Sequence, residues 1–194
     1  FQGANAAAVE LGIADQVTVE YVYGNQFFGD ADITAYMDTW YQTKAVEVVF
    51  ACGGGIYTSA VEAAKKVEGA KVIGVDVDQA AIIAGLGGEG MTVTSAMKGL
   101  AATVKATLGD IVAGKWASDY AGAIATLGLV SGDDPTANFV QIPMESTQWA
   151  DTFTQDDYKA LVAKMFAGEI TVSNDIGDMP ATDITVNAYG NIKG

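Results

Sequence analysis

The sequence predicts an α/β fold built around a parallel β-sheet. Three observations support this prediction. Helical and extended patterns alternate along the first hundred residues, the segment Lys71–Val77 is apolar enough to be buried on both faces, and glycine-rich turns separate the elements. A sheet of this kind places the carboxyl ends of its strands along one edge, which is where open α/β sheets bind ligands.

The first half of the chain alternates helix and strand. Residues 1–12 are alanine-rich and helical in propensity, with Gly12 as a plausible C-cap. Val17–Tyr23 alternates β-branched and polar residues, which predicts a strand. The elements expected next are the helix Ala31–Gln42 capped by Asp30 or Asp32, the strand Ala45–Ala51, the helix Tyr57–Val67, and the strands Lys71–Val77 and Met91–Ser95. This order predicts βαβ units, because parallel strands need crossover connections.

The second half is less regular. Gly99–Ala113 predicts a long amphipathic helix, and Asp156–Ala167 predicts a last helix that Gly168 ends. Ala123–Val130 and Ala137–Ile142 are expected to be strands. Residues 173–194 have little periodicity and are expected to be loop or tail.

Composition excludes several kinds of function. The chain has no histidine, its 10 basic residues are all lysine, and its net charge is −14. Catalysis by a Ser-His-Asp or Cys-His set and His-ligated metal or haem sites are therefore excluded. The strong negative charge makes binding to nucleic acid improbable and disfavours anionic membrane surfaces. We expect no metal site and no cofactor, and the single cysteine cannot form an internal disulfide.

A glycine turn after the second strand is the strongest local feature. Cys52-Gly53-Gly54-Gly55 leads from the strand Ala45–Ala51 into a helix, so backbone N–H groups could face a ligand there. The turn partly imitates a dinucleotide fingerprint, since Gly53-x-Gly55-x-x-Thr58 lacks only the third glycine and Asp76 follows 21 residues after Gly55. A simple tight turn is an equally available interpretation.

Two charged residues follow neighbouring strands. Asp76 ends the strand Lys71–Val77 and could accept hydrogen bonds from two adjacent hydroxyls, although a turn or capping role is an alternative. Asp78 is better placed to cap the segment after it. Lys98 comes just after the strand Met91–Ser95 and could pair with Asp76 or donate to a ligand; otherwise it is a solvated lysine at the start of a helix.

Aromatic side chains and the cysteine have ordinary explanations beside functional ones. Phe27 and Phe28 lie in a polar loop, where they could stack on a ring or anchor the loop to the core. The tryptophans are expected to be packing residues, and Cys52 is expected to be small and buried. The tryptophans are Trp40, Trp116 and Trp149.

The order of these motifs resembles the basic membrane protein family. The resemblance rests on "VEVVFACGGGIYTSAVEAAKK", "KVIGVDVDQ", "MTVTSAMKGLAATVKATLGDIVAGKW" and "ATLGLVSG", with "FQGANAAAVELG" near the start and "FAGEITV" near the end. The members of this family are substrate-binding lipoproteins of ABC importers and include purine-nucleoside receptors. The match covers nearly the whole chain, and the pair "GVDVDQ" and "TSAMK" is its most specific part.

The resemblance implies a type I periplasmic-binding fold, in which two α/β lobes close on a ligand by a hinge motion. Residues 1–94 would be the second lobe without its first strand, and residues 95–194 would supply the hinge crossings and part of the other lobe. Asp76 would bind ribose hydroxyls and Lys98 would donate to the sugar. The backbone of Gly53 and Gly54 would line the cleft, with Phe28, or else Phe27, as its aromatic residue.

The same resemblance implies an extracytoplasmic solute-binding protein that is not an enzyme. Its partners would be a nucleoside or similar solute and the permease subunits of an importer, and its only membrane contact would be a lipid anchor outside this chain. The base-gripping residues of the family's first lobe have no counterpart here, so the base cannot be assigned. An NAD(P)-dependent oxidoreductase of the Rossmann type, using Gly53, Gly55 and Asp76, is the main alternative. The same fold binding a flavin or a sugar is another.

Overall fold

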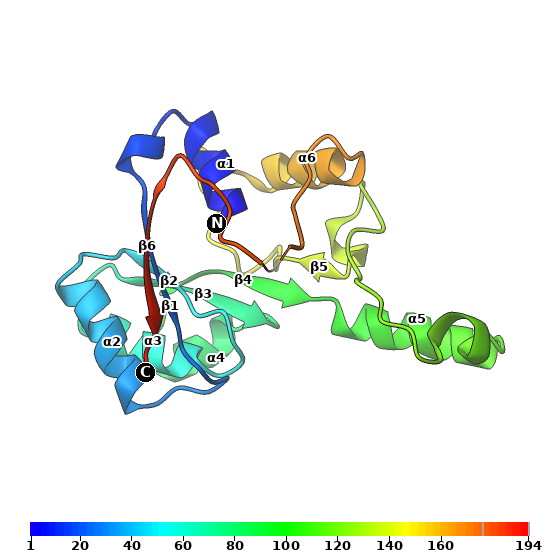
Figure 1. Cartoon of the computed structure of the whole chain (residues 1–194), viewed down its shortest axis with the longest axis horizontal. Coiled ribbons are helices and arrows are strands. Elements are labelled where there is room, and N and C mark those ends of the chain that lie inside the picture. The colour runs from blue at the N-terminus through cyan, green and yellow to red at the C-terminus, as the bar shows by residue number, and fades with distance from the viewer. Residues whose placement is uncertain (176, 194) are drawn as a thin grey trace.

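The computed structural model describes residues 1–175 and 177–193 and confirms the α/β prediction. Its strands form two sheets that are mainly parallel and flanked by helices (Figure 1). The larger sheet has the strand order β2-β3-β4-β5, and the smaller sheet pairs β1 with β6. The strands are β1 (Thr18–Tyr23), β2 (Val48–Phe50), β3 (Lys71–Asp76), β4 (Thr92–Lys98), β5 (Val140–Gln141) and β6 (Thr185–Asn191).

The helices agree closely with the sequence pattern. The α-helices are α1 (Gln2–Glu10), α2 (Ala31–Gln42), α3 (Tyr57–Ala64), α4 (Ala80–Gly85), α5 (Leu100–Val112) and α6 (Gln155–Phe166). Shorter turns are η1 (Ala14–Gln16), η2 (Trp116–Tyr120) and η3 (Pro135–Ala137). Asp30 caps α2 as expected, because its side chain accepts a hydrogen bond from the Ile33 N–H.

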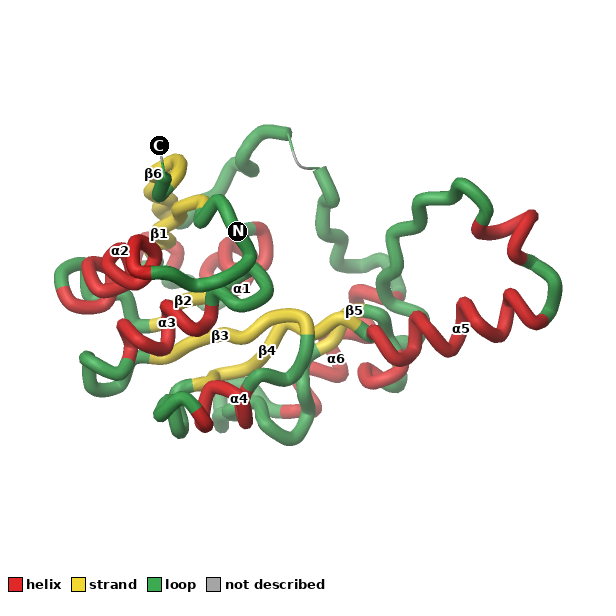
Figure 2. The backbone as a smooth tube through the Cα atoms, turned by 90° about the horizontal axis from the view of Figure 1, so that it is seen from below, coloured by secondary structure: helices red, strands yellow, loops and turns green. Residues whose placement is uncertain are grey.

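The larger sheet aligns the carboxyl ends of three strands. β2 pairs with β3 and β3 with β4, both in parallel, whereas β5 pairs antiparallel with β4 (Figure 2). The turns after β2, β3 and β4 therefore emerge at the same edge. This is the edge at which the sequence analysis placed the candidate ligand site.

The core lies on one face of this sheet. Val49 and Val72 are paired neighbours on β2 and β3, and both are buried against α2, α3 and α4. The small residues of α3 let the helix approach the sheet closely. On the opposite face of β2, Val48 and Phe50 are largely exposed. The buried cluster is Ile33, Met37, Trp40, Tyr41, Val49, Ala51, Ala60, Val61, Ala63, Ala64, Ala70, Val72 and Ile83.

The prediction of a loop or tail after residue 173 is wrong for Thr185–Asn191. This segment is β6, and it pairs in parallel with β1 from Thr18↔Thr185 onward. Asn5 on α1 accepts hydrogen bonds from the N–H groups of Asp183 and Ile184 and so guides the chain into the strand. The strand contains glycine and asparagine, which have low strand propensity, so its pairing with β1 decides its conformation.

The predicted strand Ala123–Val130 is also wrong. Residues 123–130 have no regular structure, and Ile124 is fully exposed. The segment has strand-forming composition but pairs with no strand in the described structure, and strand propensity acts only through such pairing. The prediction Ala137–Ile142 holds only for Val140–Gln141, because Asp134 caps a 3₁₀ turn over Pro135–Ala137.

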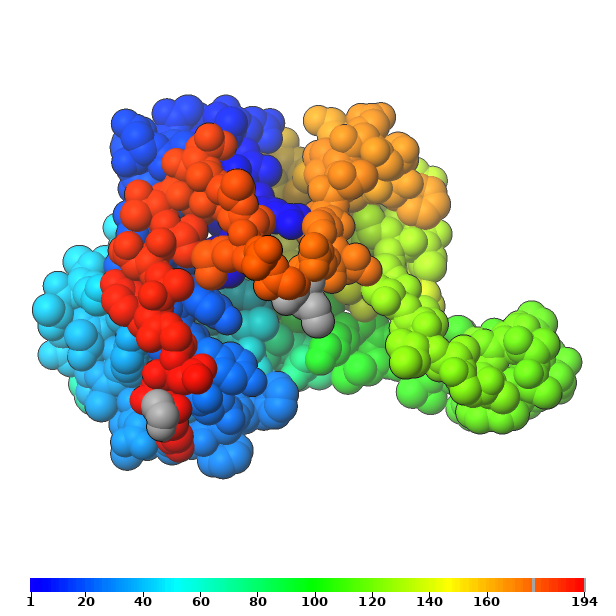
Figure 3. All heavy atoms as spheres, in the orientation of Figure 1, coloured from blue at the N-terminus to red at the C-terminus, as the bar shows by residue number. Residues whose placement is uncertain are grey.

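Helix α5 projects from the body of the protein. Its apolar stripe was predicted correctly, but none of its residues is buried, and the helix extends outward in both the ribbon and the space-filling views (Figures 1 and 3). The exposed stripe consists of Leu100, Val104, Leu108, Ile111 and Val112. None of the described helices combines the length and the apolar character needed to cross a bilayer.

Candidate functional site at the carboxyl edge of the sheet

Asp76 and Lys98 meet at the carboxyl edge of the larger sheet. Asp76 is the last residue of β3 and Lys98 the last of β4, and their side chains form an ion pair of 2.6 Å. This pairing is one of the three interpretations of Lys98 that the sequence left open. The hydrogen bond and the charge of Asp76 raise the pKa of Lys98, so the lysine is a charged donor at neutral pH. Both groups remain accessible to a ligand.

The backbone at Asp76 is held in an unusual conformation. Its φ is +69°, and the N–H of Val77 donates back to the carbonyl of Val75 at 2.8 Å. This is the γ-turn with positive φ, the rarer and more strained of the two γ-turns. Strained backbone of this kind costs about 1–3 kcal/mol and is concentrated at functional sites. The turn aims the Asp76 carboxylate beyond the end of the strand, toward Lys98.

The glycine turn packs against the loop that carries the two phenylalanines. We call residues 24–29 the aromatic loop. The Gly55 N–H donates to the carbonyl of Phe27 at 2.6 Å, and Phe28 forms a parallel bridge with Gly55. A Cβ on Gly54, whose φ is +45°, would lie 2.7 Å from the Phe27 oxygen. The glycines are therefore required for close approach by the protein's own loop.

Gln79 joins the turn to the two strands, and sequence reasoning had not identified it as a site residue. Its side chain is buried, accepts from the Val75 N–H at 3.1 Å and donates to the Gly54 carbonyl at 3.4 Å. Its own N–H donates to the hydroxyl of Ser95 on β4. A Cβ at Gly74 would lie 2.5 Å from that hydroxyl. The sequence signal was present in "GVDVDQ", where a polar residue follows a buried strand.

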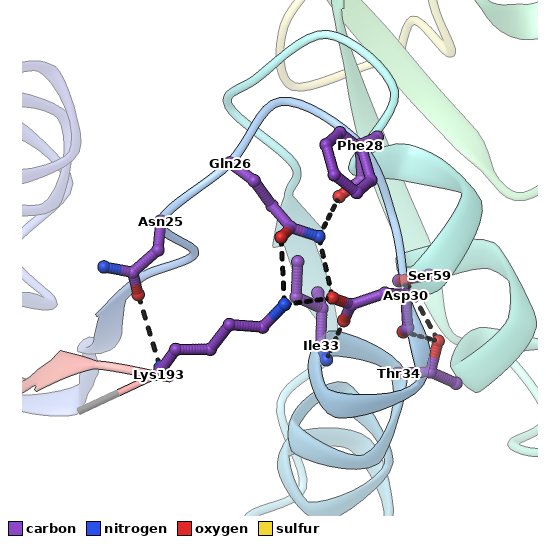
Figure 4. A network of polar contacts seen from close by, with 8 residues as sticks. All are labelled: Asn25, Gln26, Phe28, Asp30, Ile33, Thr34, Ser59 and Lys193. Atoms are coloured by element: carbon purple, nitrogen blue, oxygen red, sulfur yellow. Dashed lines mark hydrogen bonds and ion pairs between the residues drawn. The ribbon is translucent and has the colours of Figure 1, made fainter.

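The aromatic side chains of the loop are exposed, which contradicts the interpretation that they anchor it to the core and leaves the one in which they stack on a ring. Phe27 is 77% and Phe28 63% exposed, so both rings are accessible. Polar contacts hold the loop instead (Figure 4). Gln26 donates to the Phe28 carbonyl and to the Asp30 carboxylate, and Lys193 contacts both Gln26 and Asp30.

Three further expectations about side chains are wrong. Cys52 is exposed because it lies in the turn after β2. Trp116 is half exposed and stacks on Tyr120 of the projecting segment, whereas Trp40 is buried as expected. Asp78 was expected to cap the segment after it, but Gln79 is the N-cap of α4. The Asp78 carboxylate accepts from the Ala80 N–H and from the Ser146 hydroxyl.

A hollow adjoins the lysine of the ion pair. It has a volume of about 390 Å³ and is bordered by Val77, Lys98 and Gln141 together with the start of α5. Its volume lies within the range of small-molecule sites, about 300–1,000 Å³. Lys98 borders the hollow whereas Asp76, the glycine turn and Phe28 do not, so the hollow adjoins one end of the candidate site.

The donors and acceptors at this edge suit neutral polar groups. A carboxylate, an ammonium group and two accessible aromatic rings can bind hydroxyls and a flat ring. Within residues 1–175 and 177–193, no three His, Cys, Asp or Glu side chains gather as a metal site would require. The phosphate cradle of a dinucleotide site is also disfavoured, because the aromatic loop occupies the glycine turn and takes the Gly55 N–H.

Comparison with protein-family models finds no match, and comparison with curated proteins finds none either. The resemblance to the basic membrane protein family therefore stays a prediction. The residues it pointed to do fall at one edge of the sheet. Asp76 pairs with Lys98, Gly53 and Gly54 pack against the Phe28 loop, and Gln79 links the two groups.

Proposed function

We propose that this chain belongs to the solute-binding protein of an ABC importer and that it binds a nucleoside or a similar ring-bearing solute. The Asp76–Lys98 pair at the carboxyl edge of the sheet carries the proposal. The carboxylate would accept hydrogen bonds from two neighbouring sugar hydroxyls, and the ammonium group would donate to a sugar oxygen. An exposed phenylalanine of the aromatic loop would stack on the base.

The proposal is for binding without chemistry, in an extracytoplasmic protein. In it, residues 1–94 form most of one lobe, and residues 95–194 supply the crossings and part of the other lobe. The exposed apolar stripe of α5 supports this division, because an exposed apolar face of this kind usually marks a surface that another element or a partner covers. The NAD(P)-dependent alternative has less support, since the glycine turn holds the protein's own loop.

The test is the effect of Asp76→Ala on nucleoside binding by the complete protein. Each charge-assisted hydrogen bond contributes about 1.5–3 kcal/mol, so the variant should bind at least about tenfold more weakly. Calorimetry with adenosine, guanosine and uridine measures the affinity of each variant for the nucleosides. The same titration with free ribose shows how much of that affinity comes from the sugar and how much from the base.

A matched control is Asp38→Ala, which removes another aspartate that forms an ion pair, with Lys66 on the far side of the core. It should leave the affinity unchanged. Equal nucleoside affinity in wild type and Asp76→Ala would remove Asp76 from the site. Stabilisation of the wild-type protein by NAD(P)H but by no nucleoside, in a thermal-shift screen, would favour the oxidoreductase.

A further inference from the structure

The aromatic loop is closed by a residue from the opposite end of the chain. The side chain of Lys193 lies 2.5 Å from the Asp30 carboxylate and donates to the Gln26 side-chain oxygen at 2.9 Å (Figure 4). The backbone N–H of Lys193 also donates to Asn25. One lysine therefore contacts the first part of the loop, its middle and the residue that follows it.

Strand β6 brings Lys193 to this place. β6 pairs with β1 from Thr18↔Thr185 to Tyr23↔Asn191, with a register shift between Tyr21 and Tyr23. The Ile192 N–H then donates to the Tyr23 carbonyl at 3.0 Å. Because the two strands run parallel, the residues after β6 emerge beside the residues after β1, which are the aromatic loop. Figure 3 shows the C-terminal segment lying across the N-terminal residues along this path.

The lysine completes a set of hydrogen bonds that reaches the phenylalanines. The Gln26 amide nitrogen donates to the Phe28 carbonyl at 2.9 Å and to Asp30 at 2.8 Å. Lys193 donates to the oxygen of the same Gln26 amide. With both its nitrogen and its oxygen hydrogen-bonded, the amide is held in one orientation. Without Lys193, the oxygen of Gln26 loses its partner, and one oxygen of Asp30 keeps only the amide. The other oxygen of Asp30 still caps α2 through Ile33.

The opposite side of the loop is already fixed. The Phe27 carbonyl accepts from Gly55, and Gly29 has no space for a side chain, since a Cβ there would lie 2.3 Å from the Thr58 hydroxyl. The stretch between these anchors includes the exposed Phe28 ring. Its backbone forms the bridge with Gly55, and the Gln26–Asp30–Lys193 set holds the side facing away from that bridge. The position of an exposed ring depends on such ties, because burial does not hold it.

We propose that Lys193 is a positioning residue that holds the aromatic loop, and with it Phe28, in the conformation that receives a ligand ring. A loop that is ordered before binding loses less conformational entropy when the ligand arrives. The part of the proposal that concerns binding rests on the proposed function. The part that concerns the loop does not, and it is measured without a ligand.

The test compares Lys193→Met, which keeps the length of the side chain but removes the donor, with Lys193→Arg, which restores one. The Gly55 N–H donates to the Phe27 carbonyl of the aromatic loop, and its hydrogen exchange in the complete protein should speed up about fivefold in Lys193→Met, the effect of losing an exposed ion pair. Lys193→Arg should restore slow exchange. The control is Lys66→Met, because Lys66 forms a similarly exposed pair with Asp38 and should leave the loop unchanged.

Nucleoside affinity is then measured on the same variants. Lys193→Met should weaken binding by about threefold to fivefold, and Lys193→Arg should recover it. A wild-type exchange rate at the Gly55 N–H in Lys193→Met would overturn the positioning role. Faster amide exchange in Lys193→Met with an unchanged nucleoside affinity would mean that Lys193 orders the loop but that this order does not contribute to binding. If the wild type binds no nucleoside, the proposed function fails, and the exchange rates still decide the role of Lys193.

Discussion

At the scale of single residues, Asp76 combines a side-chain role with an unfavourable backbone. A φ of +69° at a residue other than glycine is uncommon, although aspartate and asparagine tolerate it better than most. Glycine at this position would remove the strain but also the carboxylate that pairs with Lys98. The presence of aspartate therefore indicates that the carboxylate matters more than the local conformational energy, which is the pattern expected where function opposes stability.

This trade-off can be measured by comparing Asp76→Gly with Asp76→Ala. Both variants lose the carboxylate, but only alanine keeps a Cβ in the left-handed region, so glycine should be more stable by about 1 kcal/mol. The measurement is the free energy of unfolding in urea for the two variants. If alanine proves as stable as glycine, the backbone at position 76 is not strained, and the γ-turn carries no functional meaning.

At the scale of elements, Gly74 shows how closely β3 and β4 are fitted together around Gln79. A methyl group at this position would lie 2.5 Å from the buried Ser95 hydroxyl and 2.9 Å from the Cβ of Gln79. Gly74→Ala should therefore lower the free energy of unfolding by about 1–3 kcal/mol, the usual cost of overpacking.

Gly109→Ala is the matched control for this substitution. Gly109 lies within α5 with open space around it, so alanine should be neutral or stabilising there by up to about 1 kcal/mol. Urea unfolding of both variants gives the comparison. Equal stability of Gly74→Ala and wild type would mean that Ser95 and Gln79 can move aside, and that their hydrogen bonds do not fix the edge of the sheet.

The elements that sequence predicted well are those whose signals are local. The cap at Asp30, the apolar runs of β2 and β3 and the β-branched residues of β4 lie within a few residues of what they determine. β6 was missed because its stability comes from pairing with β1, more than 160 residues away in the chain. The strand expected at Ala123–Val130 failed for the converse reason, since its composition is suitable but no strand pairs with it in the described structure.

In the candidate site, too, the features set by local sequence were predictable and those set by distant contacts were not. Asp76 and Lys98 were predictable as neighbours, because both follow parallel strands and such strands end at one edge. The exposure of Phe28 and Cys52 was not, because burial depends on what packs above a turn. The role of Lys193 could not be predicted at all without β6, which places it beside Asp30.

At the scale of the whole molecule, the charge is unevenly distributed. Residues 99–132, which include α5, carry two lysines and two aspartates, so the entire net charge of −14 lies on the rest of the chain. The ion pairs in the described structure are at the surface, where each contributes at most about 1 kcal/mol. Repulsion among the many unpaired carboxylates should therefore outweigh local attraction.

This imbalance predicts that salt stabilises the protein at pH 7. Raising NaCl from about 10 mM to 300 mM shortens the screening length from about 30 Å to 6 Å and should raise the melting temperature, because it weakens repulsion more than it weakens the surface ion pairs. The same salt series near pH 4.1, where the net charge approaches zero, should leave the melting temperature nearly constant.

Asp30 keeps its own contacts at this control pH. The Ile33 N–H and Lys193 lower the Asp30 pKa to about 2, below the value of about 3.9 expected for the unfolded chain. A lowered pKa gives stability that is present above pH 4 and is lost as the pH falls toward 2. The contribution of Asp30 is therefore still largely present at pH 4.1. A melting temperature that falls with salt at pH 7 would mean that the surface ion pairs, and not net repulsion, govern the electrostatic stability of the molecule.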